Sequence, residues 1–233
     1  MNTKQIGIFS CALILTGCAT KGISTASHTE PKQPVFSYEK RIDRPQAEVW
    51  DAMVKNMAQS FFVINNIDKN SRIINISFSS DKPQDYVDCG RTKRTFDDGK
   101  TTETYEYGTT DSFATYIAAS DNQPHPSVSQ RFVFVRNAKL EGRANIYVAP
   151  EGNETLVSVN TKSVVRIALS GEVQNVHAMG NIVARQRLPP DSIEVTGVTK
   201  GGTENTIPHG TSIERITCYS TGNLEKAILE LAR

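Results

Sequence analysis

The hydrophobic pattern predicts one amphipathic helix in the first third of the chain. Pro45 suits the first turn of a helix, because the N–H that proline lacks has no intrahelical partner there. Apolar residues then recur at intervals of three and four: Trp50, Met53, Val54, Met57, Ala58 and Phe61. This spacing places them on one helical face. We interpret the stripe as core packing rather than as the wall of a ligand pocket.

The chain after this helix is rich in β-branched and alternating segments, which indicate strands. A first strand is predicted before the helix at residues 36–42, and a hairpin is predicted after it from residues 61–68 and 72–79. Asp98 and Gly99 predict a tight turn. Further strands are predicted at residues 102–109, 112–119, 130–137, 139–149, 154–167, 192–198 and 212–218.

A second helix is predicted at the C-terminal end, where Asn223 can cap its first turn. Its predicted buried stripe consists of Leu224, Ala227, Ile228 and Leu231. The order strand, helix, several antiparallel strands, terminal helix predicts an α+β domain. In such a domain a curved antiparallel sheet packs on an N-terminal and a C-terminal helix.

Residues 36–80 carry a resemblance to known domains. The segment RIDRPQAEVWDAM, followed by FFVINNIDKNSRIINISF, places a Trp-bearing helix before a hairpin with a charged turn. This order resembles the opening of helix-grip domains and is similar to the repeats of BamC-like lipoproteins. The resemblance implies a helix-grip-like fold and says less about function.

The N-terminus has the pattern of an export signal. Lys4 precedes an apolar segment at residues 6–15, which is too short to span a bilayer. The sequence Leu-Thr-Gly-Cys follows and ends at Cys18. It resembles the lipobox of bacterial lipoproteins, which implies a signal peptide at residues 1–17 and a diacylglycerol thioether on Cys18. The new amino group would be acylated as well, for example with palmitate. The alternative is an ordinary secretory signal cut after Gly17 or Ala19.

The resemblance to lipoproteins also implies a location. Ala19 stands where Asp favours retention in the inner membrane, so we expect an outer-membrane anchor with the domain facing the periplasm. Residues 19–35 are polar and proline-containing, so residues 18–35 are predicted to form a lipidated, disordered tether before a single domain at residues 36–233. No apolar run reaches 18 residues, so the sequence predicts no transmembrane helix.

Composition narrows the classes of partner. The 233 residues are 38% hydrophobic and 22% charged, as in ordinary globular proteins. The full chain has 26 basic and 25 acidic side chains, and removal of the leader with Lys4 makes the two numbers equal. A neutral chain gives no reason to expect nucleic-acid binding, which depends on a basic surface.

Four cysteines are present. Cys11 lies in the leader and Cys18 is the predicted lipid site, which leaves Cys89 and Cys218 as an even pair in an oxidising compartment. We predict a disulfide between them. The alternative is a thiol nucleophile or a metal ligand, but the chain has no CxxC motif and no histidine in a recognisable relation to either cysteine.

Several clusters could carry chemistry, and each has a simpler interpretation. Asp81, Asp85 and Asp88 lack the spacing of a calcium loop and favour a solvated loop. Asp97 and Asp98 favour a turn over a carboxylate pair. A local basic patch could face lipid head groups or acidic polymers, or could be a solvated face; it consists of Arg91, Lys93, Arg94 and Lys100.

Sequence motifs for catalysis are missing. The segment TGVTKGGTENT lacks the spacing of a phosphate-binding loop, and no nucleophile-elbow or zinc-protease motif occurs. His28 falls in the predicted tether, and His125 and His209 are isolated. His177 is the one histidine that merits a test for chemistry. We therefore expect no catalytic residues, no metal site and no cofactor.

These patterns favour a non-catalytic binding or assembly component of the cell envelope. Its partners would be the membrane, through the covalent lipid, and an envelope protein or peptidoglycan. The alternative is a carrier of a small ligand or lipid in a helix-grip cavity. A third hypothesis, an envelope hydrolase, rests only on His177 and the acidic loops.

Overall fold

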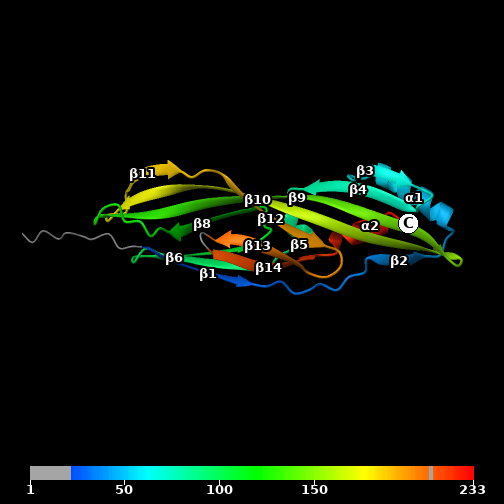
Figure 1. Cartoon of the computed structure of the whole chain (residues 1–233), viewed down its shortest axis with the longest axis horizontal. Coiled ribbons are helices and arrows are strands. Elements are labelled where there is room, and N and C mark those ends of the chain that lie inside the picture. Colours follow the sequence, from blue (N-terminus) through cyan, green and yellow to red (C-terminus); the bar gives the residue numbers. More distant parts are fainter. Residues whose placement is uncertain (1–21, 210–211) are drawn as a thin grey trace, which may run out of the picture.

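A long β-hairpin organises the molecule. The computed structural model describes residues 22–209 and 212–233. Strands β9 (Val128–Glu151) and β10 (Glu154–His177) contain 24 residues each. They pair without interruption from Glu151 and Glu154 to Val128 and His177. At about 3.3 Å per residue the hairpin is about 80 Å long, and it runs along the long axis of the molecule (Figure 1).

Six shorter strands pair along the two outer edges of this hairpin, or next to them. On the β9 side, β4 and β8 follow one another, and β3 pairs with β4; on the β10 side, β2, β12 and β11 follow one another. These strands are β2 (Glu39–Ile42), β3 (Val63–Asp68), β4 (Ile73–Ser80), β8 (Phe113–Ala119), β11 (Ile182–Arg187) and β12 (Asp191–Val198).

Two small sheets and the helices complete the fold. One sheet has the order β1–β6–β7 and the other β13–β14–β5. Their strands are β1 (Ile23–Thr29), β5 (Val87–Asp88), β6 (Arg91–Asp97), β7 (Thr102–Gly108), β13 (Thr203–His209) and β14 (Ser212–Ser220). The helices are α1 (Gln46–Ala58), α2 (Asn223–Glu230) and the short 3₁₀ helix η1 (Pro83–Asp85).

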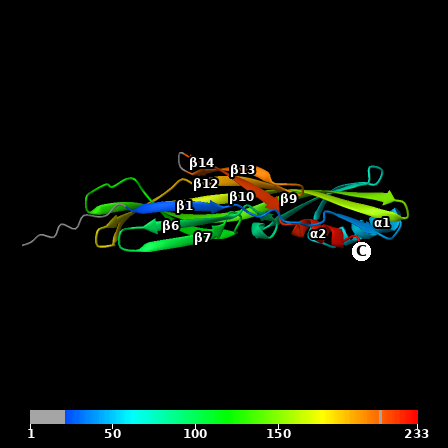
Figure 2. The ribbon, with the colours of Figure 1, turned by 90° about the horizontal axis from the view of Figure 1, so that it is seen from below.

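The two ends of the long axis differ (Figures 1 and 2). We call the end with α1, α2 and the turn between β9 and β10 the helix end. We call the opposite end, where β10 turns into β11 and β1 begins, the tip. The sheet β1–β6–β7 lies in the half of the molecule that leads to the tip, and β13–β14 lies near the middle (Figure 2).

The main hydrophobic core runs from the helix end to the middle of the molecule, where Ile193 of β12, Ile207 of β13 and Ile216 of β14 join it. Inward-facing residues of β4, β9 and β10 alternate with exposed ones, as expected for strands with one solvated face. They pack against Trp50 and Met53 of α1 and against Leu224 and Ile228 of α2. A smaller aromatic cluster around Tyr107 and Tyr116 lies between β7 and β8, in the half that leads to the tip.

The expectation of an α+β, helix-grip-like fold is wrong. The molecule is mostly β-structure with several antiparallel sheets. The helices have 13 and 8 residues, so at about 1.5 Å per residue the longer one spans about 20 Å, a quarter of the hairpin. They therefore cover one end and cannot clasp the whole sheet. The strands predicted at 130–137 and 139–149 are parts of β9, because pairing with β10 continues through Ala138.

The prediction of a disordered tether over residues 19–35 is wrong for Ile23–Thr29. These residues form β1 and pair with β6, and the hydroxyls of Thr25 and Thr95 lie 2.6 Å apart across the two strands. The segment is polar and shows no alternation, so its own side chains do not predict a strand. Pairing with β6 supplies the backbone hydrogen bonds that order it.

Other predictions from the local pattern agree with the structure. The helix after Pro45 is confirmed as α1, and the hairpin around residues 69–71 is confirmed as β3 and β4. The second helix is confirmed as α2, but its predicted cap is wrong. Gly222 is the N-cap, and the Asn223 side-chain amide instead donates to the carbonyl oxygen of Asp85 at 2.7 Å.

Candidate functional site

An open groove of about 860 Å³ crosses the solvated face of the main sheet. It exists because side chains at alternate positions of neighbouring strands point away from the core and form one surface. Five strands, β3, β4, β9, β10 and β12, contribute to it. The lining residues are Phe61, Val63, Ser77, Phe78, Ser79, Glu141, Gly142, Arg143, Lys162, Val164, Arg166 and Glu194.

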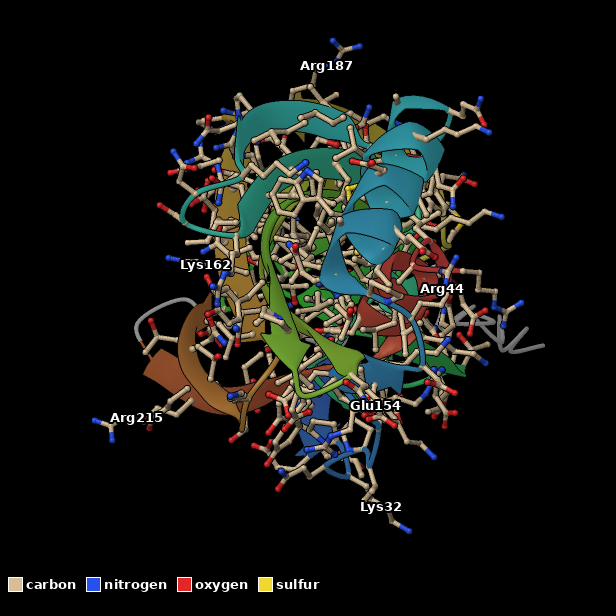
Figure 3. The ribbon with its side chains drawn as sticks, turned by 90° about the vertical axis from the view of Figure 1, so that its right-hand side faces the viewer. Lys32, Arg44, Glu154, Lys162, Arg187 and Arg215 are labelled. Atoms are coloured by element: carbon tan, nitrogen blue, oxygen red, sulfur yellow. A yellow bond between two sulfur atoms is a disulfide. The ribbon has the colours of Figure 1, made fainter. Side chains whose placement is uncertain are left out.

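Two cations face each other in this groove. Arg143 of β9 and Lys162 of β10 are direct cross-strand partners, and both are exposed. Like charges placed directly opposite one another destabilise a sheet. Among the described residues neither makes an ion pair, whereas Arg166 donates from two nitrogens to Glu194 at 2.8 and 2.7 Å. Viewed along the long axis, Lys162 points out to solvent (Figure 3). Arg143 and Lys162 are therefore available to an anionic group.

The groove also has an apolar wall. Val63, the first residue of β3, is 60% exposed, and Phe61 just before the strand is 61% exposed, so two large apolar side chains face solvent next to one another. The Phe61 ring lies on the ring of the buried Phe62, with centroids 4.3 Å apart. The groove floor depends on Gly142, because a Cβ atom there would lie 2.1 Å from Cε1 of Phe78.

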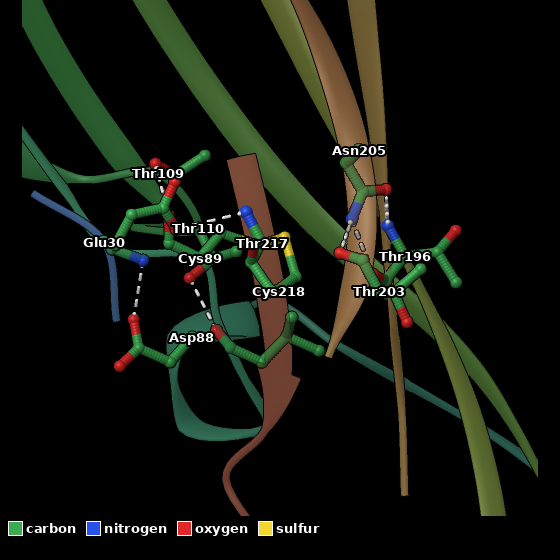
Figure 4. Close-up of a disulfide and its surroundings, with 12 residues drawn as sticks. Glu30, Asp88, Cys89, Thr109, Thr110, Thr196, Thr203, Asn205, Thr217 and Cys218 are labelled. Carbon is green, nitrogen blue, oxygen red and sulfur yellow. Dashed lines mark hydrogen bonds between the residues drawn. A yellow bond between two sulfur atoms is a disulfide. The ribbon is translucent and has the colours of Figure 1, made fainter. Parts of the chain in front are cut away.

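Strand β3 leaves a sheet edge open beside this wall. In the described chain no strand pairs with its outer edge. The outer edge of β12 is partly covered, by contrast. The side chain of Asn205 accepts a hydrogen bond from the Thr196 N–H at 2.7 Å and donates one to the Thr196 carbonyl at 2.9 Å (Figure 4). An open edge can pair with an extended segment of another chain.

The structure joins Cys89 and Cys218 in a disulfide, with 129 residues of sequence separation. Both sulfurs are fully buried, and Figure 4 shows the bond between β14 and the segment before β6. The hydroxyl of Thr110 donates to the carbonyl oxygen of Val87 at 2.7 Å and adds a second link near the bond. The bond is structural, and neither cysteine is a free thiol here. Cys18 and Cys11 lie outside the described residues.

Among the acidic candidates, the side chains of Asp81, Asp88, Asp97 and Asp98 have structural partners. Asp81 pairs with Lys139 at 3.3 Å, and Asp88 accepts the Gly90 N–H at 2.9 Å. Asp98 closes the β6–β7 turn, and the hydrogen bond that it accepts from the Thr101 N–H lowers its pKa. No group of three side chains able to ligate a metal occurs in residues 22–209 and 212–233.

The predicted basic patch is not one surface, because alternation along β6 turns Arg94 away from Arg91 and Lys93, which are both exposed. Arg94 points inward, where its Nε donates to the Tyr107 hydroxyl at 2.7 Å and its guanidinium lies 4.6 Å over the Tyr116 ring. Lys93 is exposed and pairs with Glu106 at 3.4 Å. Lys100 donates to the carbonyl oxygen of Ala178 at 2.6 Å.

The described histidines make local contacts. His177 ends β10, and its Nδ1 accepts the Met179 N–H at 3.3 Å. His125 contacts the hydroxyl of Ser127 at 2.7 Å, and His28 is half-buried with Nδ1 3.4 Å from the hydroxyl of Thr92. The His28 position is therefore not in a solvated tether. The side chain of His209 lies outside the part that the structure describes.

A buried carboxyl group was not predicted. Glu225 of α2 is fully buried and accepts hydrogen bonds from Thr161, Thr199 and Ser220 at 2.7, 2.8 and 3.0 Å. These hydroxyls come from β10, the segment after β12 and the end of β14. No sequence motif marks this cluster, because its members are up to 64 residues apart. It is closed to solvent, so it holds α2 on the sheet rather than acting on a ligand.

Comparisons with protein-family models, characterised proteins and solved structures found no match to this chain. Among the described residues no helix has the length and apolar content needed to cross a bilayer.

Proposed function

We propose that this protein is a lipid-anchored, non-catalytic binding or assembly component of the bacterial cell envelope. Its anchor would be the lipid on Cys18, which the resemblance to the lipobox implies. The protein would be located at the outer membrane, with its domain in the periplasm. Its partner would be another envelope protein that places an acidic, partly apolar segment in the groove. The observation that carries this proposal is the pair Arg143 and Lys162 beside exposed Phe61 and Val63.

Charge supports an acidic partner. Bringing a carboxylate between Arg143 and Lys162 would replace a repulsive cross-strand pair with two attractive contacts. Both cations are exposed, so their main effect would be on the rate and specificity of association. Phe61 and Val63 would supply apolar contact area next to the charged centre, which is the usual composition of a binding surface.

The groove does not suit a carrier. A protein that hides a lipid or small apolar ligand needs an enclosed, mostly apolar cavity. The groove is open and carries five charged side chains, and the fold that implied an internal cavity is not the observed one. An anchored binding protein needs only modest affinity, because confinement to the membrane raises the effective concentration of neighbouring proteins.

Photo-crosslinking in cells would test the groove. A photoreactive amino acid replaces Val63, with the same group at exposed Thr115 of β8 as the site control. We expect a defined crosslinked partner from position 63, and we expect the double variant Arg143→Glu, Lys162→Glu to abolish it. The matched charge control is Lys32→Glu, Arg187→Glu, since both side chains point to solvent elsewhere (Figure 3). A crosslink from position 63 that persists in the Arg143→Glu, Lys162→Glu variant would refute the proposed site.

The anchor has a separate test. Intact-mass analysis of the protein from membranes should show a mature chain that begins at Cys18 and carries fatty acids, and the Cys18→Ser variant should lack them. A wild-type N-terminus without acyl chains would contradict the anchor without affecting the groove.

A further inference from the structure

The tip carries exposed apolar side chains at the end of the molecule farthest from the helices. Met179 and Val183 are 77% and 58% exposed, and Ile182 is 36% exposed. They belong to the turn after β10 and to the start of β11. Ile23, the first residue of β1, is 67% exposed. Both regions lie at the same end of the long axis (Figure 1).

Hydrogen bonds tie these segments together. The Ala119 N–H at the end of β8 donates to the Ser24 hydroxyl oxygen at 2.7 Å, next to Ile23. Lys100 in the β6–β7 turn donates to the carbonyl oxygen of Ala178 at 2.6 Å, next to Met179. Hydrogen bonds therefore join β1, β8 and two turns at the tip. The exposed apolar side chains belong to segments that these bonds hold in place.

The path of the chain places the predicted anchor at this end. Strand β1 enters the fold at the tip and runs toward the middle, since Ile23 pairs with Asp97 next to the β6–β7 turn. Cys18 precedes Gly22 by four residues, which span at most about 14 Å however the chain is arranged. The acyl chains on Cys18 would therefore hold the tip, and not the helix end, close to the membrane.

We propose that the tip rests on the lipid surface, with Met179, Ile182 and Val183 in contact with the bilayer interface. This inference rests on the proposed Cys18 anchor. The side chains add apolar contact area to the acyl chains, a second attachment of the kind that fixes the orientation of anchored proteins. The long hairpin then stands away from the membrane. Arg143 is 15 residues from Val128 along β9, so the groove lies about 50 Å above the surface.

Fluorescence quenching by brominated lipids would test the orientation. The natural Trp50 is 3% exposed and lies in the helix end, so it serves as an internal reference. Met179→Trp places an indole at the tip, and Tyr147→Trp, at a position 41% exposed on β9, is the matched control far from it. The acylated mature protein, residues 18–233, is reconstituted into vesicles of phosphatidylcholine with and without brominated acyl chains. Flotation measures attachment in the same samples.

We expect the Met179→Trp protein to float, to show an emission maximum shifted to the blue, and to lose emission in brominated vesicles. The Tyr147→Trp protein should float as well, but brominated lipid should quench it no more than it quenches the wild-type protein. Floating protein without quenching at position 179 would overturn the inference and leave the anchor intact. Equal quenching at positions 147 and 179 would show a molecule lying flat and would also overturn it. Failure of the wild-type protein to float would refute the anchor and, with it, the orientation.

Discussion

Glu225 offers the sharpest test of how α2 is held on the sheet. Its carboxylate is fully buried and its hydrogen-bond partners are three hydroxyls rather than a cation. Replacing Glu225 with Ala removes the common acceptor of Thr161, Thr199 and Ser220. The backbone of α2 and the apolar contacts of Leu224 and Ile228 remain.

The magnitude follows from the donors left behind. A buried hydroxyl without a partner costs about 1–3 kcal/mol. The Thr161 and Thr199 hydroxyls lie 2.9 Å apart and can bond to one another, so two of the three donors lose their acceptor. The resulting loss of about 2–6 kcal/mol is partly offset because a carboxylate no longer has to be buried. We expect Glu225→Ala to lower the free energy of unfolding by about 3 kcal/mol.

Two further variants separate hydrogen bonding from shape. Glu225→Gln keeps the volume and one acceptor oxygen, and its amide can donate to a rotated Ser220 hydroxyl, so we expect a loss of about 1 kcal/mol. The combination Glu225→Leu, Thr161→Val, Thr199→Val removes the carboxylate and two of its hydroxyl donors. Thr199→Val also leaves the Thr161 N–H without its acceptor at 2.6 Å, but the apolar side chains fill the volume that Glu225→Ala leaves empty, so this variant should be more stable than Glu225→Ala.

Urea unfolding with the disulfide intact measures these differences, provided that the slope of the transition is unchanged. A Glu225→Ala protein within about 0.5 kcal/mol of the wild type would refute the reasoning, because that is the ordinary range of surface substitutions. An apolar triple variant less stable than Glu225→Ala would also contradict it.

Three further predictions concern other parts of the fold. The double variant Cys89→Ala, Cys218→Ala opens a loop of 129 residues and should lose up to about 5 kcal/mol in urea unfolding, an upper bound from chain entropy; an unchanged midpoint would count against the bond. Gly142→Ala should destabilise by about 1–3 kcal/mol because its Cβ clashes with the Phe78 ring, and Phe78→Leu in the same chain should recover most of the loss. Burial raises the pKa of Tyr116, so the folded state keeps this phenol protonated above its ordinary pKa of 10.0. The contribution of Tyr116 to the free energy of unfolding should therefore be fully present below about pH 10 and be lost as the pH rises through the folded pKa. Urea unfolding at a series of alkaline pH values should show a smaller loss of stability for Tyr116→Phe than for the wild type.

Local elements were predictable where the pattern repeats within a short window. The stripe that contains Trp50 and Met53 identifies α1, and the run through Ile74 and Ile76 identifies β4, since periods of 3.6 and 2 are properties of single segments. Strand β1 was not predictable in this way. Its backbone is satisfied by β6, a segment more than 60 residues away, and no feature of its own side chains points to that pairing.

The candidate site shows the same division. Arg143 and Lys162 are unremarkable charges in the sequence, and neither was singled out from it. They become a site only because the β9–β10 register places them opposite one another, and because Val63 of β3 and Phe61 just before it line the same groove. The four-residue motif that ends at Cys18, by contrast, can be identified from the sequence alone, because it is a linear motif that does not depend on tertiary structure.

The amino-acid sequence by itself was enough to predict the export signal with its lipobox, the two helices and most strands of the main sheet, because each depends on the order of nearby residues. Tertiary structure alone decided that β9 and β10 form one uninterrupted hairpin, that β1 belongs to the folded part, and that Glu225 meets three hydroxyls. It also decided that the tip and the groove lie at different distances from the start of β1. Each of these depends on pairing between distant segments, where the free energy comes from contacts that no local pattern encodes.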